Sequence, residues 1–155
     1  ATLVAGQYLP NGKIGVGIMD QWRSDTAVDE LQIAADIKTK WVDKYFPRMI
    51  MFDHYSTASI AARLTASGCR MVDVSGTAFY QASGDLLDAI VNNRIVHMGQ
   101  ESFDLQMNAC AAKTNDSGWR IVRRASAGDV SAPISLAMIV HKMQEPVSTP
   151  MIVAG

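Results

Sequence analysis

Residues 48–76 read RMIMFDHYSTASIAARLTASGCRMVDVSG, and this stretch decides the predicted fold. Arg48–Phe52 is a short, continuous apolar run, which favours a strand buried on both faces. Ser56–Ser67 is a helix rich in small residues, with Gly68 as a suitable C-cap. Arg70–Val74 is a second strand of the same kind. Strand, helix and strand in this order indicate an α/β unit with parallel strands.

The segments before this unit predict a hairpin and a long helix. Ala1–Leu9 and Ile14–Trp22 are β-rich runs, and Asn11-Gly12 between them is a strong turn signal. Ala27–Phe46 has apolar residues at helical spacing, and Pro47 ends the helix. The expected apolar stripe consists of Leu31, Ala34, Ala35, Trp41, Val42 and Tyr45.

The segments after the unit continue the alternation. We expect a helix from Ser83 or Asp85 to Asn93, a helix over 102–113, a polar loop over 114–118, a strand over 119–123 and a last helix over 130–143. The apolar stripe of the first of these helices is Leu86, Leu87, Ile90 and Val91. The whole pattern predicts an α/β domain with a mixed sheet, antiparallel at one edge, over residues 1–144. Residues 145–155 are expected to be an irregular tail.

Composition fits one globular domain. The chain has 155 residues, of which 48% are hydrophobic and 19% are charged, and this argues against disorder. No apolar run reaches the roughly 18 residues of a membrane span, and the N-terminus lacks the layout of a signal peptide. Cys69 and Cys110 do not form a CxxC pair, which favours two free, partly buried thiols over a zinc site. The net charge of −1 is less basic than is usual for a DNA-binding domain.

Several familiar kinds of catalytic site are excluded. Gly6 and Gly12-Lys13 have the wrong spacing for a phosphate-binding loop, and Ile14 stands where a magnesium-holding Ser or Thr is needed. No GxSxG elbow is present. The three histidines (His54, His97 and His141) do not have the spacing of metal ligands.

Two aspartates remain as candidates for metal-dependent chemistry. Asp53 directly follows a buried strand, where an unpaired charge is costly, and Asp129 directly precedes the last helix. Hard cations such as Mg²⁺ and Mn²⁺ prefer carboxylate oxygens, and a two-metal site needs carboxylates from different parts of the chain. A purely structural role is open for both, because Asp is a common N-cap and turn residue.

The ordered set of motifs resembles the nuclease domain of phage terminase large subunits. The stretch 48–76 is similar to that family's second acidic motif. Residues 82–113, ASGDLLDAIVNNRIVHMGQESFDLQMNACAAK, resemble its next segment, with His97-Met98-Gly99 as a short turn and Asn108-Ala109 in the following helix. Residues 118–143, GWRIVRRASAGDVSAPISLAMIVHKM, resemble its closing segment.

The resemblance implies an RNase H-like fold and a divalent-metal-dependent DNA endonuclease. Asp53 and Asp129 would be the catalytic residues and the metal ligands, and the implied cofactor is a pair of Mg²⁺ or Mn²⁺ ions.

 The two ions would activate water and stabilise the leaving oxygen. The implied partners are double-stranded DNA, the ATPase domain of the same large subunit, the portal protein and the small terminase subunit. The implied place of action is the host cytoplasm, at the assembling capsid, with cleavage of concatemeric DNA when packaging starts and ends.

The chain departs from the family pattern at its beginning. The family's first acid lies on the central strand of the sheet, and its expected position is at or just before Ala1. Either the first strand is lacking here, or ATLVAGQYL is that strand without its acid, with Asp20 or Asp25 as a substitute. A sheet without its central strand has two unpaired edges.

The sequence also contains candidate DNA contacts and is compatible with other functions. Arg123 and Arg124, just upstream of Asp129, are the candidate DNA contacts, and a solvated strand edge is the alternative for them. Two other functions are compatible with the sequence: a non-catalytic docking module of the packaging motor, and a nuclease of the junction-resolvase type.

Overall fold

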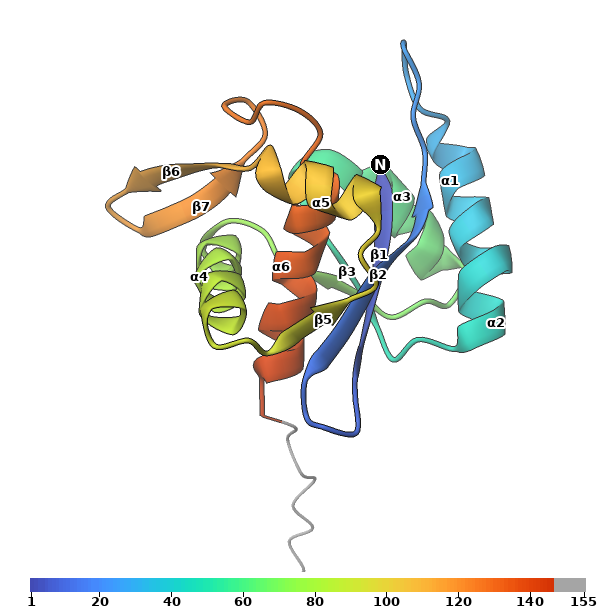
Figure 1. Cartoon of the computed structure of the whole chain (residues 1–155). Helices are drawn as coiled ribbons and strands as arrows, with labels where there is room; N and C mark the ends of the chain where they lie inside the picture. Colours follow the sequence, from blue (N-terminus) through green and yellow to red (C-terminus); the bar gives the residue numbers. More distant parts are fainter. Residues whose placement is uncertain (147–155) are drawn as a thin grey trace, which may run out of the picture.

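The computed structural model describes residues 1–146, and Figure 1 shows the arrangement of their elements. The first sheet begins with the hairpin of β1 (Thr2–Tyr8) and β2 (Ile14–Gln21), which pair antiparallel. The turn between them is closed by a hydrogen bond from the Gly12 amide to the Leu9 carbonyl (2.9 Å). Strand β5 (Ile95–His97) pairs parallel with β2, so the sheet order is β1-β2-β5. The predicted hairpin is confirmed.

Two further pairs of strands complete the β structure. Strands β3 (Ile50–Phe52) and β4 (Met71–Asp73) are parallel neighbours, joined through α3 (His54–Ala66). Strands β6 (Ala111–Asn115) and β7 (Gly118–Val122) form an antiparallel hairpin. In Figure 1 this hairpin extends away from the first sheet. The predicted mixture of parallel and antiparallel pairing is therefore confirmed.

The sheet is interrupted between β1 and β3. Within residues 1–146, neither strand pairs with the other, so each has one unpaired edge. The two pieces nevertheless share apolar neighbours on both faces. Leu3 of β1 and Ile50 of β3 pack against one buried cluster, whereas Val4 of β1 and Met51 of β3 belong with the other.

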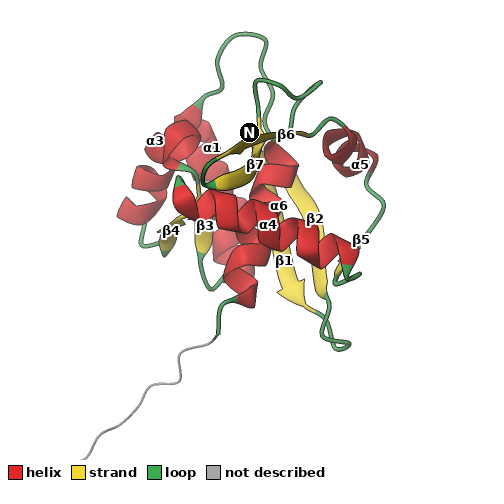
Figure 2. Ribbon diagram, turned by 90° about the vertical axis from the view of Figure 1, so that its left-hand side faces the viewer, coloured by secondary structure: helices red, strands yellow, loops and turns green. Residues whose placement is uncertain are grey.

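Helices cover both faces of the strands. One side carries α4 (Thr77–Val91), α5 (Glu101–Asn108) and α6 (Ser131–Gln144), and Figure 2 shows α4 and α6 crossing in front of the strands. The other side carries α3 and a segment made of α1 (Glu30–Asp36), the π-helix η1 (Ile37–Val42) and α2 (Asp43–Tyr45). The result is a layered α/β fold, as predicted.

The predicted helix over 27–46 is present but differs in detail. It begins at Glu30, because the Asp29 side chain accepts a hydrogen bond from the Gln32 amide and caps it. Its buried residues are Ile33, Ala34, Asp36 and Ile37, whereas Leu31 of the predicted stripe is 60% exposed. The π-helical turn at 37–42 changes the spacing of the apolar positions, which a regular 3.6-residue repeat does not anticipate.

The predicted start and apolar stripe of α4 are wrong. The helix begins at Thr77, after Gly76 with a φ of 57°, and not at Ser83 or Asp85. Its buried residues are Phe79, Ala82, Ser83, Leu86 and Ala89. Three members of the predicted stripe (Leu87, Ile90 and Val91) are exposed. The earlier start makes Phe79 part of the buried face, and the remaining buried positions follow from it at helical spacing.

The predicted helix over 102–113 is too long. Helix α5 ends at Asn108, and residues 111–113 belong to β6. Pairing with β7 determines the conformation of these residues. In the register of the two strands, Lys113 lies opposite Arg120. Tertiary pairing outweighs the helix propensity of the two alanines, as is common for weak local preferences.

The last helix agrees with its predicted range within one residue at each end. Glu145 and Pro146 follow it without helical structure, and the rest of the predicted tail lies outside the described residues. Among residues 1–146, no helix combines the length and apolar character that crossing a membrane requires.

Gly6 allows α6 to approach β1 closely. A Cβ atom at this position would lie 2.5 Å from Cγ2 of Ile139. We expect Gly6→Ala to destabilise the fold by about 1–3 kcal/mol, because the helix must move away from the strand. Gly84 of α4 is the control, since a Cβ there meets nothing within 4 Å. Gly84→Ala should be stabilising by about 0.5–1 kcal/mol. Urea unfolding followed by circular dichroism measures both, and equal effects of the two changes would contradict the close packing.

Candidate functional site

Two carboxylates lie together at the ends of two parallel strands. Phe52 pairs with Asp73 in the register of β3 and β4, and Asp53 follows Phe52 directly. Asp53 also caps α3, because its Oδ1 accepts a hydrogen bond from the Tyr55 amide (3.1 Å). Its Oδ2 accepts one from the Ser56 hydroxyl (3.0 Å). The structural role expected as an alternative for Asp53 is therefore present, and it fixes the direction of the carboxylate.

The Ser75 hydroxyl connects the two carboxylates. Its Oγ lies 3.2 Å from Oδ1 of Asp53 and is also hydrogen-bonded to Oδ1 of Asp73. The same oxygen accepts a hydrogen bond from the His54 amide (3.0 Å). One hydroxyl thus places a donor between two negative groups and reduces the repulsion between them.

His54 is oriented by Asp73. Its Nδ1 lies 2.7 Å from Oδ2 of Asp73. Partial burial opposes ionisation of Asp73, but hydrogen bonds from Ser75 and His54 and the charge of His54 outweigh it and lower the pKa of this carboxyl. Asp73 is therefore held in its charged form beside Asp53.

Asp129 stands at the beginning of α6. Its Oδ1 accepts a hydrogen bond from the Ser131 amide (2.9 Å), within the first turn of the helix. Burial opposes its ionisation, but the hydrogen bonds from Ser131 and the positive charges of the Ala1 amino group and Arg123 lower its pKa. Asp129 is consequently a stable carboxylate close to the start of β1.

Arg123 interacts with the surroundings of both Asp53 and Asp129. One guanidinium nitrogen donates to the Ser56 hydroxyl (3.4 Å), which in turn donates to Asp53. The charge of the same guanidinium acts on Asp129. The structure therefore brings Asp53, Asp129 and Arg123 to one end of the molecule. Arg124 is exposed in the loop that follows β7.

Within residues 1–146, Asp20 and Asp25, the candidate substitutes for the family's first acid, do not share the hydrogen-bond partners of Asp53 and Asp129. Asp20 lies on β2, and its Oδ2 accepts a hydrogen bond from the indole of Trp41 (3.1 Å). Its Oδ1 accepts one from the Gln21 amide (2.9 Å). Asp25 is exposed in the loop before α1. Within the described part of the chain, no hydrogen bond connects either residue with Asp53 or Asp129.

The donor set suits a hard cation only in part. Carboxylate and hydroxyl oxygens are the ligands that Mg²⁺ and Mn²⁺ prefer. However, residues 1–146 contain no group of three or more His, Cys, Asp or Glu side chains placed to hold a metal ion. Since Mg²⁺ often keeps several waters and takes only one or two carboxylates from a protein, Asp53 and Asp129 would be its protein ligands.

Asp73, Ser75 and His54 were missing from the predicted site. A signal for Asp73 was present, because it ends the second apolar strand run as Asp53 follows the first. Neighbouring parallel strands bring such ends together. The contacts of Ser75 and His54 depend on the turn after β4, which sequence spacing does not reveal. The two cysteines are free and half-buried, as predicted, and burial raises the pKa of the Cys110 thiol.

We expect Ser75→Ala to destabilise the protein by about 1 kcal/mol, because Asp53 and Asp73 lose a shared donor and the His54 amide loses its acceptor. Thermal unfolding measures the effect. Ser67→Ala is the matched control at the other end of α3, where the exposed hydroxyl donates to the Arg63 carbonyl (3.0 Å). A loss of stability at Ser75 no larger than at Ser67 would contradict a connecting role.

Comparison with known proteins supports the architecture. No protein-family model and no curated protein matches the chain. Among solved structures, the chain is similar to one described as the crystal structure of the HK97 bacteriophage large terminase, with a TM-score of 0.76 and 14% sequence identity. The similarity covers 91% of this chain and 36% of the terminase chain, so this chain spans about a third of that protein's length. The fold of this chain is therefore that of a part of a phage large terminase, as the sequence motifs predicted.

Proposed function

We propose that this chain is the nuclease part of a viral DNA-packaging motor and cleaves concatemeric double-stranded DNA with divalent metal ions. One observation carries the proposal: Asp53 and Asp129, distant in sequence, both lie near Arg123. This arginine donates to the Ser56 hydroxyl that is bonded to Asp53, and its charge acts on Asp129. The shared fold with the HK97 large terminase supports it. The proposed site residues are Asp53 and Asp129, which the resemblance to the terminase motifs implies.

Asp53 and Asp129 would hold Mg²⁺ or Mn²⁺. When bound, the metal ions supply a polarised phosphate and an activated water, as in two-metal nucleases. The chain's own residues prepare the ligands. Ser56, Ser75 and the Tyr55 amide fix the Asp53 carboxylate, and the Ser131 amide fixes that of Asp129. Fixed ligands lower the cost of reorganisation when a cation and a substrate arrive.

Arg123 would hold a phosphate of the DNA beside the carboxylates, and exposed Arg124 would add a second contact. A guanidinium binds phosphate oxygens with two parallel hydrogen bonds. Within residues 1–146, the hydrogen-bond partner of the Arg123 guanidinium is the Ser56 hydroxyl at 3.4 Å, which a phosphate would readily replace. The proposed partners in the motor are the ATPase part of the large subunit, the portal and the small terminase subunit, acting in the host cytoplasm.

A second candidate function is a non-catalytic docking module of the same motor. The observation that favours it is the lack, within residues 1–146, of a group of three metal-binding side chains. A docking module has no need for a saturable metal site. Metal binding and cleavage therefore separate the two candidates.

We expect Asp53→Ala and Asp129→Ala each to lower Mn²⁺-dependent plasmid cleavage by about 100-fold or more, because each change removes a ligand that positions the metal. Gel electrophoresis of supercoiled plasmid measures cleavage, and calorimetric titration with Mn²⁺ measures binding. Arg63→Ala is the control, since Arg63 lies in the last turn of α3, whereas Asp53 caps its first turn.

Unchanged cleavage in the Asp53 variant would overturn the proposed role of the site. A wild-type chain without saturable Mn²⁺ binding and without cleavage would favour the docking module. Circular dichroism of each variant excludes loss of the fold as the cause.

A further inference from the structure

Arg23 lies beside the candidate site, although the sequence motifs do not include it. It directly follows Trp22, whose backbone pairs with Ala1 through two hydrogen bonds of 2.8 and 2.9 Å. Ala1 in turn lies close to Asp129, because the hydroxyl of the next residue, Thr2, lies 2.6 Å from that of Ser131, whose amide donates to Asp129 (2.9 Å). The charges of Asp129, Arg123 and Arg23 all act on the Ala1 amino group, in agreement with these contacts. Arg23 and Arg123 therefore both approach the end of the molecule that carries Asp129.

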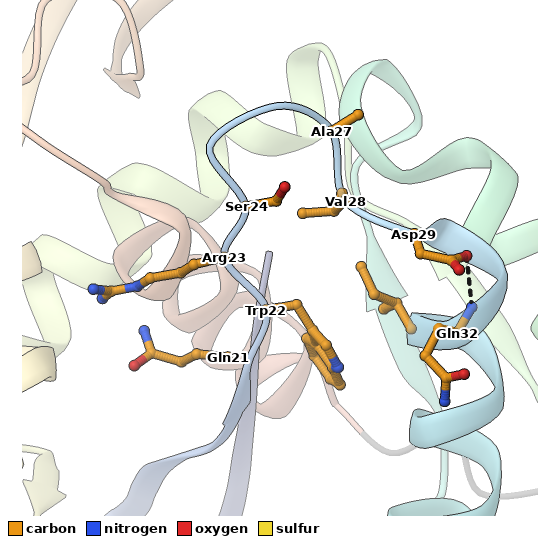
Figure 3. A pocket seen from close by; sticks show the side chains of 9 residues that line it. Gln21, Trp22, Arg23, Ser24, Ala27, Val28, Asp29 and Gln32 are labelled. Atoms are coloured by element: carbon orange, nitrogen blue, oxygen red, sulfur yellow. Dashed lines mark hydrogen bonds between the residues drawn. The ribbon is translucent and has the colours of Figure 1, made fainter.

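The base of the Arg23 loop is fixed. The indole of Trp22 donates to Oδ2 of Asp36 (3.0 Å), so both its backbone and its side chain are anchored. The loop then passes over an open cavity of about 400 Å³ and reaches α1 at its cap, Asp29. Figure 3 shows the Arg23 side chain pointing away from Val28 and Asp29, on the opposite side of the loop's base. Arg23 is thus held at a defined place while its side chain extends outward.

The Arg23 guanidinium is available to an anion. Several other basic side chains have acidic partners: Lys38 pairs with Asp43, Lys40 with Asp36, Arg94 with Asp88 and Lys142 with Glu145. Arg23 is exposed and makes no ion pair with any residue in the range 1–146. An unpaired guanidinium at the end of the molecule that carries carboxylates offsets the repulsion that these exert on a phosphate.

We propose that Arg23 binds a phosphate of the DNA backbone, so that Arg23 and Arg123 together hold the strand across the end that carries Asp53 and Asp129. This inference rests on the proposed function and extends its substrate contacts to the loop before α1. Arg23 is a positioning residue, since it contacts a phosphate and no reacting atom. Double-stranded DNA presents closely spaced charges, about one per 1.7 Å of helix axis, so two separated cations can engage one backbone at once.

Fluorescence anisotropy with a labelled 30-base-pair duplex tests the inference, in EDTA so that no cleavage occurs. Arg23→Ala should weaken binding about fivefold at about 100 mM salt and lower the slope of log K against log[salt] by about one, because one phosphate contact is lost. Arg23→Lys should retain most of the affinity, since it keeps the charge. Arg63→Ala is the matched control for the loss of one exposed arginine.

The outcomes separate this inference from the proposed function. If the wild type binds and cleaves DNA while Arg23→Ala behaves like Arg63→Ala, the Arg23 contact is wrong and the nuclease stands. If Arg23→Ala lowers both affinity and salt slope but the wild type does not cleave, the DNA surface stands and the nuclease is wrong. If the wild type binds no duplex even at about 20 mM salt, where phosphate contacts are strongest, both are wrong. Equal unfolding temperatures of all variants exclude a structural effect.

Discussion

The burial of α6 is the constraint on which the rest of the structure depends. Nine of its residues are buried (Ser131, Ala132, Pro133, Ile134, Leu136, Ala137, Met138, Ile139 and Val140), and a helix that is apolar on nearly all sides must be surrounded by other elements. It packs against β1, where Gly6 removes the side chain that would keep it away, and against α4 and α5. Because it also contacts β3, it spans the interruption between the two sheet pieces that no backbone pairing closes. The position of α6 therefore sets the position of both pieces.

The same packing determines where the polar groups gather. The N-terminus of α6 carries Asp129, and the N-terminus of α3 carries Asp53. Unpaired amide groups and the helix dipole make both places favourable for a negative charge. Asp53 is the N-cap of α3, whereas Asp129 precedes Val130, the N-cap of α6, and accepts a hydrogen bond from the Ser131 amide. Both carboxylates are therefore held still, and this is compatible with the proposed metal-binding role, because a metal ligand has to be held still. Asp73 on the neighbouring strand is likewise held in place, by hydrogen bonds with Ser75 and His54.

Much of this could be predicted from the sequence, and the failures have physical causes. The hairpin at Asn11-Gly12, the β3-α3-β4 unit and the last helix rest on turn chemistry and on apolar runs, which are local signals. The predicted buried face of α4 was wrong because the helix starts earlier than expected, so that Phe79 belongs to the buried face. The predicted helical conformation of residues 111–113 was wrong because pairing with β7 outweighs their helix propensity. In the site, Asp53 and Asp129 stood out by position, but the link through Arg123 and Ser56 depends on the loop after β7, whose course no periodicity predicts.

Net charge is a poor guide to what this end of the molecule can bind. The chain as a whole carries a net charge of −1, which by itself argues against contact with DNA. Many of its charges, however, cancel locally in ion pairs such as Lys40 with Asp36 and Arg94 with Asp88. Electrostatic attraction for a phosphate depends on the local field, which falls off over about 8–10 Å in salt, and not on the sum over the surface. Arg123 acts directly on Asp129, and the charges of Arg123 and Arg23 both act on the neighbouring Ala1. In the proposed function, the cations beside the two carboxylates would allow a phosphate to approach together with a metal ion, whereas carboxylates alone would repel the phosphate.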